Sequence, residues 1–464
     1  MSNVLTKIVD TKAAHIESLK ARFPEESLNP KISTRSLYQA LSGDKAGFIL
    51  ECKKASPSKG LIRDDFDPIA IAEVYSHYAS AVSVLTDEEF FQGDMAFLPM
   101  VRTKVDQPIL CKDFFVSPYQ VKLAAHQGAD AILLMLSVLD DEQYQLLAAE
   151  AAKYQLDTLT EISNEEELAR AIALQAPIVG INNRNLRDLS THIETTERLA
   201  PQLPDGMLVI SESGIYTHQD VRRLSPLVNG FLVGSSLMSE DDLDLACRKL
   251  LLGHHKVCGL TRAEDIAVAA DAGAIYGGLI FAEKSPRKVS IDQAKALAAA
   301  NSARQRKLQL VGVFVNERAE VIAELAASLD LAAVQLHGEE TEHDITAIKQ
   351  ALTKARCLNT EVWKAIPVST EATTEIAAIP ANADRLLFDS KNASGFGGTG
   401  ARFDWSQSLP YKAQAMLAGG LSAANAKDAA NAGFYGLDFN SGVETAPGIK
   451  DAPQIIAALT AVRA

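Results

Sequence analysis

The sequence contains few cysteines, and their spacing fits neither of the structures that cysteines usually build. Five occur among 464 residues, at Cys52, Cys111, Cys247, Cys258 and Cys357. An odd number without a CxxC motif or a histidine-paired spacing argues against a disulfide framework and against a zinc site. We therefore expect no bound metal and a chain that stays in a reducing compartment, the cytoplasm.

Long apolar runs and an excess of basic residues are also missing. The longest strongly apolar stretch, residues 131–139, has about half the length that a bilayer requires. The first ten residues contain no apolar segment of a secretory signal. Lys and Arg number 45 against 59 Asp and Glu, so the formal net charge is −14. These absences predict a soluble protein that binds neither membranes nor nucleic acid and needs no protein partner, and any phosphate must be held locally.

Hydrophobic residues make up 47% of the chain, which is ample for two or three domains. After an amphipathic opening of about 45 residues, short apolar runs alternate with helical patterns, which is typical of parallel βα units. Eight strand-like runs lie in the first half, at residues 47–56, 81–88, 108–115, 131–137, 157–163, 177–185, 207–214 and 230–236. Eight more follow a short basic stretch, at residues 256–260, 276–281, 308–316, 332–338, 361–368, 385–390, 415–421 and 436–442.

Twice eight units predict an α/β protein of two consecutive (β/α)8 TIM barrels. We expect the first barrel in residues 1–254, with an N-terminal helical extension, and the second in residues 255–464. A repeated pattern supports this, because Gly128, Gly273 and Gly433 each follow an Ala-rich helix, where a left-handed residue would end it. An open, doubly wound sheet is the alternative, and it requires that some strands in each half be misassigned.

Glycine and serine gather where the seventh and eighth strands of each half end. These residues are Ser213, Gly214, Gly234 and Ser235 in the first half, and Gly419, Gly420, Ser441 and Gly442 in the second. In TIM barrels the loops after these strands commonly hold phosphate, because small residues let backbone N–H groups approach its oxygens. Glycine and serine also make ordinary tight turns, but four such loops at matching places favour phosphate binding.

Ionisable and polar residues collect at the ends of the first-half strands. They are Glu51, Lys53, Lys112, Glu161, Asn182, Arg184 and Glu212, with Ser56 following the first strand. Glu51 and Lys53 are two residues apart, so their side chains point to one face. A single charged strand residue usually marks a solvated face, but the strands of a parallel barrel have none. We expect one pocket in which burial and mutual repulsion lower the proton affinity of the lysines, so that they act as acids near neutral pH.

The second half has a sparser set of candidates. Cys258 lies at its first strand, and Arg287, His337 and Asp389 lie at or beyond the second, fourth and sixth. A thiol and a carboxyl across one barrel would form a base–acid pair. The other four cysteines are expected to be small apolar core residues. Residues 391–400 predict a flexible loop, either a lid near the substrate entrance or a surface loop.

Longer motifs in these regions resemble two known families. The first half contains ILECKKASPSKG, LCKDF, TEIS, GINNRNL, ISESGI and LVGSSLM, which together resemble indole-3-glycerol-phosphate synthase. The second half contains KVCGLT, GVFVN, VQLHG, LFDS, GGTG, LAGGL and DFNSGVE, which resemble phosphoribosylanthranilate isomerase. The resemblance covers essentially the whole chain, and the fused order is similar to that of a bifunctional family of bacterial tryptophan biosynthesis.

The resemblance implies two consecutive reactions on small phosphorylated anthranilate derivatives, with no metal or redox cofactor. The second half would act first, converting N-(5-phosphoribosyl)anthranilate to 1-(2-carboxyphenylamino)-1-deoxyribulose 5-phosphate by an Amadori rearrangement. Asp389 would be the acid that assists opening of the furanose ring, and Cys258 the base that removes the C2 proton. Arg287 would contact the anthranilate, His337 the substrate, and the last two loops the phosphate.

The first half would then close the indole ring with loss of CO₂ and water, giving indole-3-glycerol phosphate. By similarity, Lys112 and Lys53 supply acid catalysis and contact the substrate carboxylate, and Glu161 is the base that assists dehydration. Glu51 and Asn182 would position groups and stabilise charge. The resemblance places further substrate contacts at Ser56, Arg184 and Glu212, and phosphate contacts at Ser213, Gly214, Gly234 and Ser235.

Two other functions fit parts of the pattern. One is a different pair of phosphate-sugar enzymes on the same fold, such as aldolase-like lyases, for which a borohydride-trapped Schiff-base lysine would be diagnostic. The other is a non-catalytic scaffold or binding protein, which a turnover assay distinguishes.

Overall fold

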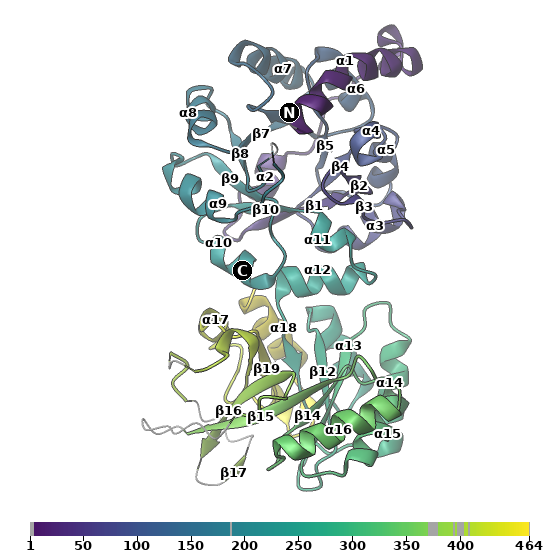
Figure 1. The fold of residues 1–464 in the computed structure, drawn as a ribbon, viewed down its shortest axis with the longest axis vertical. Coiled ribbons are helices and arrows are strands. Elements are labelled where there is room, and N and C mark those ends of the chain that lie inside the picture. The colour runs from purple at the N-terminus through teal and green to yellow at the C-terminus, as the bar shows by residue number, and fades with distance from the viewer. Residues whose placement is uncertain are drawn as a thin grey trace. The chain divides into compact units, whose positions relative to one another are not determined.

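The computed structural model describes residues 4–185, 188–369, 379–392, 395–396, 403–406 and 409–463. The chain forms two compact units, one extending from the N-terminus to Cys247 and the other spanning Arg248–Arg463. Each unit is a barrel of parallel strands with helices on its outside (Figure 1).

The first unit is a closed barrel of eight parallel strands. The strands are β1 (Gly47–Cys52), β4 (Ala81–Leu85), β5 (Ile109–Lys112), β6 (Ala131–Met135), β7 (Asp157–Ile162), β8 (Ile178–Asn182), β9 (Leu208–Glu212) and β10 (Gly230–Val233). Closure is direct, because β1 pairs in parallel with both β10 and β4. An open doubly wound sheet is thereby excluded for this unit. A short antiparallel hairpin follows β1, made of β2 (Ala55–Ser56) and β3 (Gly60–Leu61).

The predicted helical extension precedes this barrel. It contains α1 (Val4–Arg22), a 3₁₀ turn (Glu25–Ser27) and α2 (Leu37–Leu41). The remaining helices are α3 (Pro68–Tyr75), α4 (Glu88–Phe91), α5 (Phe97–Arg102), α6 (Pro118–His126), α7 (Asp141–Lys153), α8 (Glu165–Ala173), α9 (Glu194–Leu199), a 3₁₀ turn (Ala200–Gln202), α10 (His218–Leu224), α11 (Ser235–Met238) and α12 (Leu243–Leu252).

The second unit closes in the same way. Its parallel strands are β11 (Lys256–Val257), β12 (Tyr276–Ile280), β13 (Gln309–Phe314), β14 (Ala333–Leu336), β15 (Glu361–Ser369), β16 (Arg385–Asn392), β18 (Met416–Leu417) and β19 (Gly436–Phe439). Pairing of β11 with β19, and of β15 with β16, completes the ring. Short antiparallel strands are added by β17 (Gly395–Phe396), which pairs with β16, and by the hairpin of β20 (Glu444–Ala446) and β21 (Ile449–Lys450).

Helices also follow the strands of the second unit. Those described are α13 (Ala263–Ala272), α14 (Ile291–Ser302), α15 (Ala319–Leu329), α16 (Glu342–Lys354), a 3₁₀ turn (Lys412–Gln414), α17 (Ala426–Asn431) and α18 (Ala452–Ala461). Among the helices of the described residues, none is both long and apolar enough to cross a bilayer.

Fourteen of the sixteen barrel strands lie within the predicted segments, and β15 and β16 extend one and two residues beyond theirs, so the prediction of two TIM barrels is confirmed. The helix ends agree as well, because Gly128, Gly273 and Gly433 have φ of 89°, 105° and 84°, the left-handed conformation that a glycine accepts without strain. The strands are short and buried on both faces, as parallel barrel strands must be. The three short hairpin segments were not predicted, because two- and three-residue strands carry too little pattern.

A buried ion pair fastens α1 to the first barrel. Lys12 Nζ lies 2.6 Å from a carboxylate oxygen of Asp87 and 2.6 Å from one of Asp113, and Lys12 is 1% exposed. Asp87 follows β4 and Asp113 follows β5, so both carboxylates lie at the carboxyl ends of neighbouring strands. The ammonium group of Lys12 therefore anchors α1 at the carboxyl end of the barrel, where the active sites of TIM barrels form.

Because each barrel closes on its own strands, the chain should divide into two fragments that fold alone. We expect fragments 1–254 and 255–464 each to unfold cooperatively on heating, as measured by circular dichroism. Arg248 refines this expectation, because its buried guanidinium donates to the carbonyl oxygens of Ala274 and Lys307, both at 2.9 Å.

A fragment that begins at residue 248 should therefore melt on the order of 5 °C higher than one that begins at residue 255. An Arg248→Met variant of the longer fragment is the matched control and should melt like the shorter fragment. Failure of both halves to show a cooperative transition would contradict the proposed division.

Candidate active sites

The carboxyl end of the first barrel brings together the ionisable residues predicted from the sequence. Glu51 lies on β1, Lys112 on β5, Glu161 on β7, Asn182 on β8 and Glu212 on β9. Eight of the predicted residues line one cavity: Glu51, Lys53, Ser56, Lys112, Glu161, Asn182, Arg184 and Ser213. The other four predicted residues of this half do not belong to its lining: Glu212, Gly214, Gly234 and Ser235.

Glu51 lies between two ammonium groups. Lys53 Nζ is 2.5 Å from its Oε1, and Lys112 Nζ is 3.4 Å from its Oε2. Lys112 also lies 3.0 Å from Glu212 Oε2, so it bridges two carboxylates. Glu51 is 2% exposed and Glu212 is 1% exposed. Since neither carboxylate reaches water, each depends on the lysines for compensation of its charge.

Burial and pairing shift the pKa values of these groups in different directions. Burial raises the pKa of Glu51, but the charges of Lys53 and Lys112 outweigh it and lower that pKa to about 2. Burial lowers the pKa of Lys53, as predicted. Burial also acts to lower the pKa of Lys112, yet Glu212, Glu51 and Glu161 reverse the direction and raise it. The predicted fall in proton affinity is therefore wrong for Lys112, which keeps its positive charge at neutral pH.

Glu161 behaves in the opposite way from Glu51. Burial and the nearby charge of Glu212 raise its pKa to about 8, although Lys112 and a hydrogen bond from Asn182 oppose the rise. The orientation of Asn182 follows from its other bond, because its Oδ1 accepts from the backbone N–H of Arg184 at 2.9 Å. Its amide nitrogen is then available to Glu161. At neutral pH this carboxyl is mostly protonated, and it ionises as the pH rises past 8.

The rest of the cavity lining combines apolar side chains with polar and charged ones. The apolar side chains come from α1, α4, the barrel strands and the loops that follow them, namely Val4, Leu5, Ile8, Leu85, Phe91, Phe114, Leu133, Met135 and Leu189. The Arg184 guanidinium donates to Ser58 Oγ at 2.7 Å, which joins the loop after β8 to the loop after β1. The cavity thus offers an apolar wall beside charged groups.

The predicted phosphate loops of the first half contribute in two ways. Ser213 and Gly214 both have left-handed backbones, with φ of 64° and 80°, and make a tight turn directly after β9. A Cβ on Gly234 would overlap Glu51 Oε1, and a Cβ on Gly180 would overlap Glu212 Oε1. Glycine is required at Gly180 on β8 and at Gly234 directly after β10, because the buried carboxylates occupy the space of a side chain.

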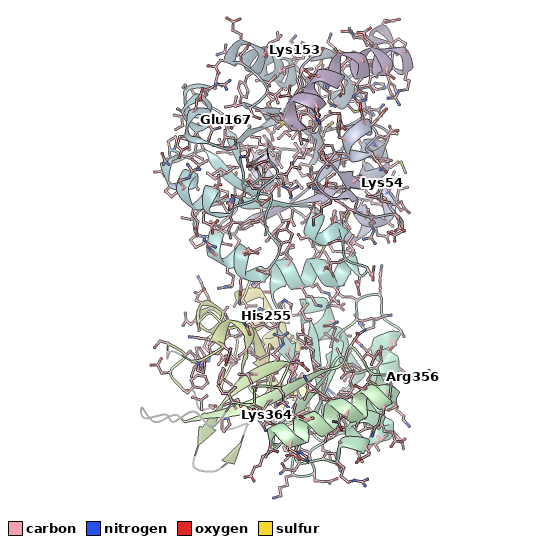
Figure 2. The ribbon with its side chains drawn as sticks, viewed as in Figure 1. Lys54, Lys153, Glu167, His255, Arg356 and Lys364 are labelled. Carbon is pink, nitrogen blue, oxygen red and sulfur yellow. The ribbon has the colours of Figure 1, made fainter. Side chains whose placement is uncertain are left out.

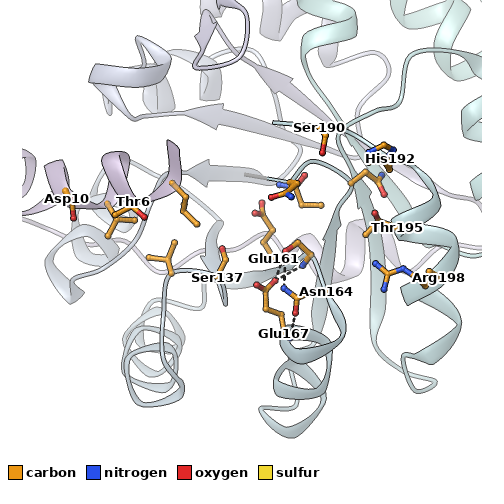
Figure 3. A pocket seen from close by; sticks show the side chains of 17 residues that line it. Thr6, Asp10, Ser137, Glu161, Asn164, Glu167, Ser190, His192, Thr195 and Arg198 are labelled. Atoms are coloured by element: carbon orange, nitrogen blue, oxygen red, sulfur yellow. Dashed lines mark hydrogen bonds between the residues drawn. The ribbon is translucent and has the colours of Figure 1, made fainter. Parts of the chain in front are cut away.

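A second cavity, of about 580 Å³, adjoins the first at Glu161 and Asn182, which line both (Figure 3). Its other labelled members are polar and come from α1, from α8 and α9, and from the loops after β6, β7 and β8: Thr6, Asp10, Ser137, Asn164, Glu167, Ser190, His192, Thr195 and Arg198. Beside it, Glu167 accepts hydrogen bonds from the backbone N–H and the hydroxyl of Ser163, at 2.6 and 3.0 Å. Glu161 therefore borders two spaces of different polarity.

The second barrel gathers its predicted residues around one cavity of about 620 Å³. Seven of the eight line it: Cys258, Arg287, His337, Asp389, Gly419, Gly420 and Ser441. The eighth, Gly442, is packed below, where a Cβ would overlap the carbonyl oxygen of Leu421. The predicted pairing of a thiol with a carboxyl in one pocket agrees with this placement.

Asp389 lies in β16, three residues before the end of the strand, and next to two other predicted residues. His337 Nε2 is 3.2 Å from Asp389 Oδ2. Gly419, with φ of 88°, lies so close that its Cβ would be 2.8 Å from Asp389 Oδ1. Gly420 follows with φ of 65°, so this barrel repeats the double left-handed turn that Ser213 and Gly214 make after the seventh strand of the first.

Arg287 is held by a pairing that the sequence did not indicate. Its guanidinium binds both carboxylate oxygens of Glu444, at 2.7 to 3.0 Å, and Lys450 Nζ contacts the same carboxylate at 2.7 Å. Glu444 and Lys450 lie on the β20–β21 hairpin. This hairpin therefore orients the arginine at the edge of the cavity.

Lys364 of β15 supports the loop that follows His337 (Figure 2). Its Nζ donates to the carbonyl oxygen of Gly338 at 2.6 Å and to Glu340 Oε2 at 2.8 Å. Glu340 in turn accepts from the backbone N–H groups of Asn316 and Gly338. The loop is thus fixed by charge rather than by apolar packing.

Sequence reasoning also missed Lys256, Asp438 and Gln335, which are buried beside Cys258 and His337. A signal was present, because Lys256 precedes Cys258 by two residues and Gln335 precedes His337 by two, the spacing that singled out Glu51 and Lys53. The predicted flexible loop at residues 391–400 lies partly outside the described residues. Within the described ranges, no group of three or more His, Cys, Asp or Glu side chains could hold a metal ion.

Comparison with known proteins assigns each barrel. Residues 5–250 match the family model of indole-3-glycerol phosphate synthase, and residues 255–461 match that of N-(5'-phosphoribosyl)anthranilate (PRA) isomerase. The chain is 55% identical to the tryptophan biosynthesis protein TrpCF of Vibrio cholerae, over 98% of this chain and 95% of that protein. It is 53% identical to TrpCF of Salmonella typhi over the full length of both, and 52% identical to TrpCF of Vibrio parahaemolyticus over 100% of this chain and 95% of that protein.

Both halves and their order therefore agree with one set of relatives, and the chain belongs to the bifunctional TrpCF family, in which an indole-3-glycerol phosphate synthase domain precedes a phosphoribosylanthranilate isomerase domain.

Proposed function

We propose that the second barrel isomerises N-(5-phosphoribosyl)anthranilate with Asp389 as the acid and Cys258 as the base. Asp389 gives a proton to the furanose oxygen while the C1–O bond breaks, and the nitrogen lone pair forms a C=N bond. The Cys258 thiolate then removes the C2 proton, and the electrons of the C–H bond form C1=C2 as the C=N electrons return to nitrogen. The resulting enolamine gains a proton at C1 and loses one from O2 as it becomes the ketone. The observation that supports these roles is the placement of both groups in one cavity.

The other residues of this cavity would bind the two ends of the substrate. Arg287, already oriented by Glu444, presents a guanidinium to the anthranilate carboxylate. Gly419, Gly420, Ser441 and Gly442 would hold the phosphate through the tight turns after the last two strands. His337, within 3.2 Å of Asp389, would contact the substrate beside the acid.

The first barrel then closes the indole ring. The apolar wall would accept the aromatic ring, and Lys53 and Arg184 would approach the carboxylate that is lost as CO₂. The aryl carbon attacks the ketone, and the charge that develops on the ketone oxygen falls beside Lys112, whose pairing with two carboxylates keeps it cationic. Lys53, whose pKa is lowered by burial, is the better proton donor of the two.

Glu161 would assist the last step, the removal of water, as a base, with Asn182 holding its carboxylate. Glu51 fixes the two lysines, and Glu212 fixes Lys112 from below. Ser56, Ser213, Gly214, Gly234 and Ser235 complete the site around the phosphate end of the substrate. The substrates are thus small phosphorylated anthranilate derivatives, and five free thiols support a cytoplasmic location.

Replacement of Cys258 by alanine should separate the two activities. We expect Cys258→Ala to lower isomerisation at least 100-fold, the usual contribution of a positioned base, while ring closure stays near normal. The first is measured by consumption of phosphoribosylanthranilate, and the second by indole-3-glycerol phosphate formed from the isolated ribulose intermediate. Cys357→Ala, which replaces a half-buried thiol that lines neither cavity, is the control and should leave both rates unchanged. Near-normal isomerisation by Cys258→Ala would remove the thiol from the mechanism.

Replacement of Lys112 by methionine should cripple ring closure and leave isomerisation intact. The ammonium next to the developing oxyanion is expected to contribute 10²–10⁴-fold, or roughly 3–5 kcal/mol of transition-state stabilisation. Melting should also fall, because Glu212 loses the cation that lies 3.0 Å away. Lys122→Met, on the exposed face of α6, is the matched control. If ring closure falls less than tenfold and the melting temperature is unchanged, the role in stabilising the developing oxyanion belongs to Lys53 instead.

The ionisation of Glu161 should govern the pH dependence of ring closure. Its pKa of about 8 means that the carboxyl is mostly protonated at pH 7 and becomes a base as the pH rises. We therefore expect kcat for ring closure to increase between pH 7 and 9, and Glu161→Gln to be slower by about 100-fold without that increase. Isomerisation by the same variant is the internal control. The same rise in wild type and variant would assign the dependence to another group.

A further inference from the structure

Lys256 is the most deeply buried charged group in the second barrel and has no part in the chemistry proposed above. It lies on β11, two residues before Cys258, and its exposed fraction is 0%. Its Nζ lies 2.7 Å from Asp438 Oδ2 and 3.0 Å from Gln335 Oε1, and its charge acts on the neighbouring thiol of Cys258. An ammonium group has three N–H donors, so these two acceptors leave one donor for the thiol.

The strand beside β11 leaves room for this arrangement. Gly278 of β12 has no side chain, and a Cβ there would lie 2.6 Å from Cys258 Sγ and 3.1 Å from Lys256 Cε. The thiol and the lysine stem therefore share the space above one glycine. Apolar packing of the lysine stem alone would not explain why the ammonium group lies beside the thiol.

A chain of hydrogen bonds leads from Lys256 to the proposed acid, Asp389, and the donor of each bond can be assigned. Because an ammonium only donates, the Gln335 atom that meets it must be the oxygen, and the Gln335 amide nitrogen then faces His337 Nδ1 at 3.2 Å. That nitrogen only donates, so His337 Nδ1 accepts and carries no proton. The imidazole proton lies on Nε2, which points to Asp389 Oδ2 at 3.2 Å. One chain of bonds thus runs from the ammonium to the carboxyl.

We propose that Lys256 is a positioning residue for both groups of the isomerase, stabilising the thiolate of Cys258 directly and fixing the His337 tautomer opposite Asp389 through Gln335. The inference rests on the proposed function, because it assigns Lys256 a role only if Cys258 is the base and Asp389 the acid. Asp438 is the counter-ion that keeps the ammonium charged inside the barrel.

Several charges act on the thiol together. Burial raises the pKa of Cys258 and the carboxylate of Asp438 raises it further, whereas Lys256 and Lys450 lower it. Arg287, whose side chain packs against Gly259 next to the thiol, also interacts with the sulfur. Among these charged groups Lys256 has the largest effect on the pKa of the thiol. Removing Lys256 and removing Asp438 should therefore move the ionisation of the thiol in opposite directions.

The test measures thiol ionisation without using turnover. In a Cys357→Ala background, the rate at which iodoacetamide alkylates Cys258 is followed from pH 6 to 10 by mass spectrometry of its peptide. Cys52, Cys111 and Cys247 are buried at 1% exposure or less and serve as unreactive internal references. Below the pKa the rate follows the thiolate fraction, so each unit of pKa changes it about tenfold.

We expect Lys256→Met to alkylate at least tenfold more slowly than the parent at pH 7.5, and Asp438→Asn to alkylate faster. The rising limb of the isomerase pH profile should move with the alkylation pKa in both variants. Gln335→Leu should leave alkylation unchanged but lower isomerisation, because it frees the His337 tautomer.

The two variants are expected to change the alkylation rate in opposite directions, so a folding defect in one of them does not decide the test. If Lys256→Met does not fold with Asp438 unpaired, faster alkylation in Asp438→Asn still supports the proposal, and an unchanged rate overturns it. Equal alkylation rates in Lys256→Met and its parent overturn it as well. Alkylation that shifts as expected, together with full isomerisation by Cys258→Ala, would leave the thiol environment as inferred and refute the proposed function instead.

Discussion

The strands of a closed parallel barrel have no solvated face, and this constraint shapes both sites. Any charged group placed at the carboxyl ends of the strands must find its counter-charge inside the protein. In the first barrel Glu51 and Glu212 are compensated by Lys53 and Lys112. In the second, Lys256 is compensated by Asp438. The charged groups proposed to act in the reactions therefore belong to the same ion pairs that compensate buried charge in the folded barrels.

Glycine provides the space that these pairs occupy. A Cβ would overlap a buried carboxylate oxygen at Gly180 and at Gly234, and it would crowd the thiol at Gly278 and the acid at Gly419. Only the last of these has a left-handed backbone, so the other three are not explained by turns. Two of the glycines that the sequence pointed to as phosphate loops thus also serve the catalytic groups, because their missing side chains let Glu51 and Asp389 lie close.

The fold could be predicted almost completely, because two successive series of eight apolar runs and their helices repeat the pattern of a (β/α)8 barrel, and an open sheet would require some of the strands to be misassigned. The positions of Glu51, Lys112, Glu161, Cys258 and Asp389 followed from that pattern, since strand ends share one rim. Protonation could not be predicted in the same way. Whether a buried lysine gains or loses proton affinity depends on how many carboxylates reach it, and the sequence does not reveal that Lys112 touches two and Lys53 one. Arg287 and Glu444 are 157 residues apart, so their pairing carried no local signal.

Both barrels place a lysine and a second ionisable residue at the end of the first strand. In each, the two lie two residues apart, so both side chains share one face: Glu51 with Lys53, and Lys256 with Cys258. The order of charge is reversed, because the first barrel has the carboxylate first and the second has the cation first. The lysine that follows the carboxylate lines the cavity and can meet a substrate, whereas the lysine that precedes the thiol does not line its cavity and acts through the thiol and through Gln335. Whether the lysine comes two residues after or two residues before its partner on the first strand therefore decides its proposed role. In the first barrel it takes part in the reaction, and in the second it positions another residue that does.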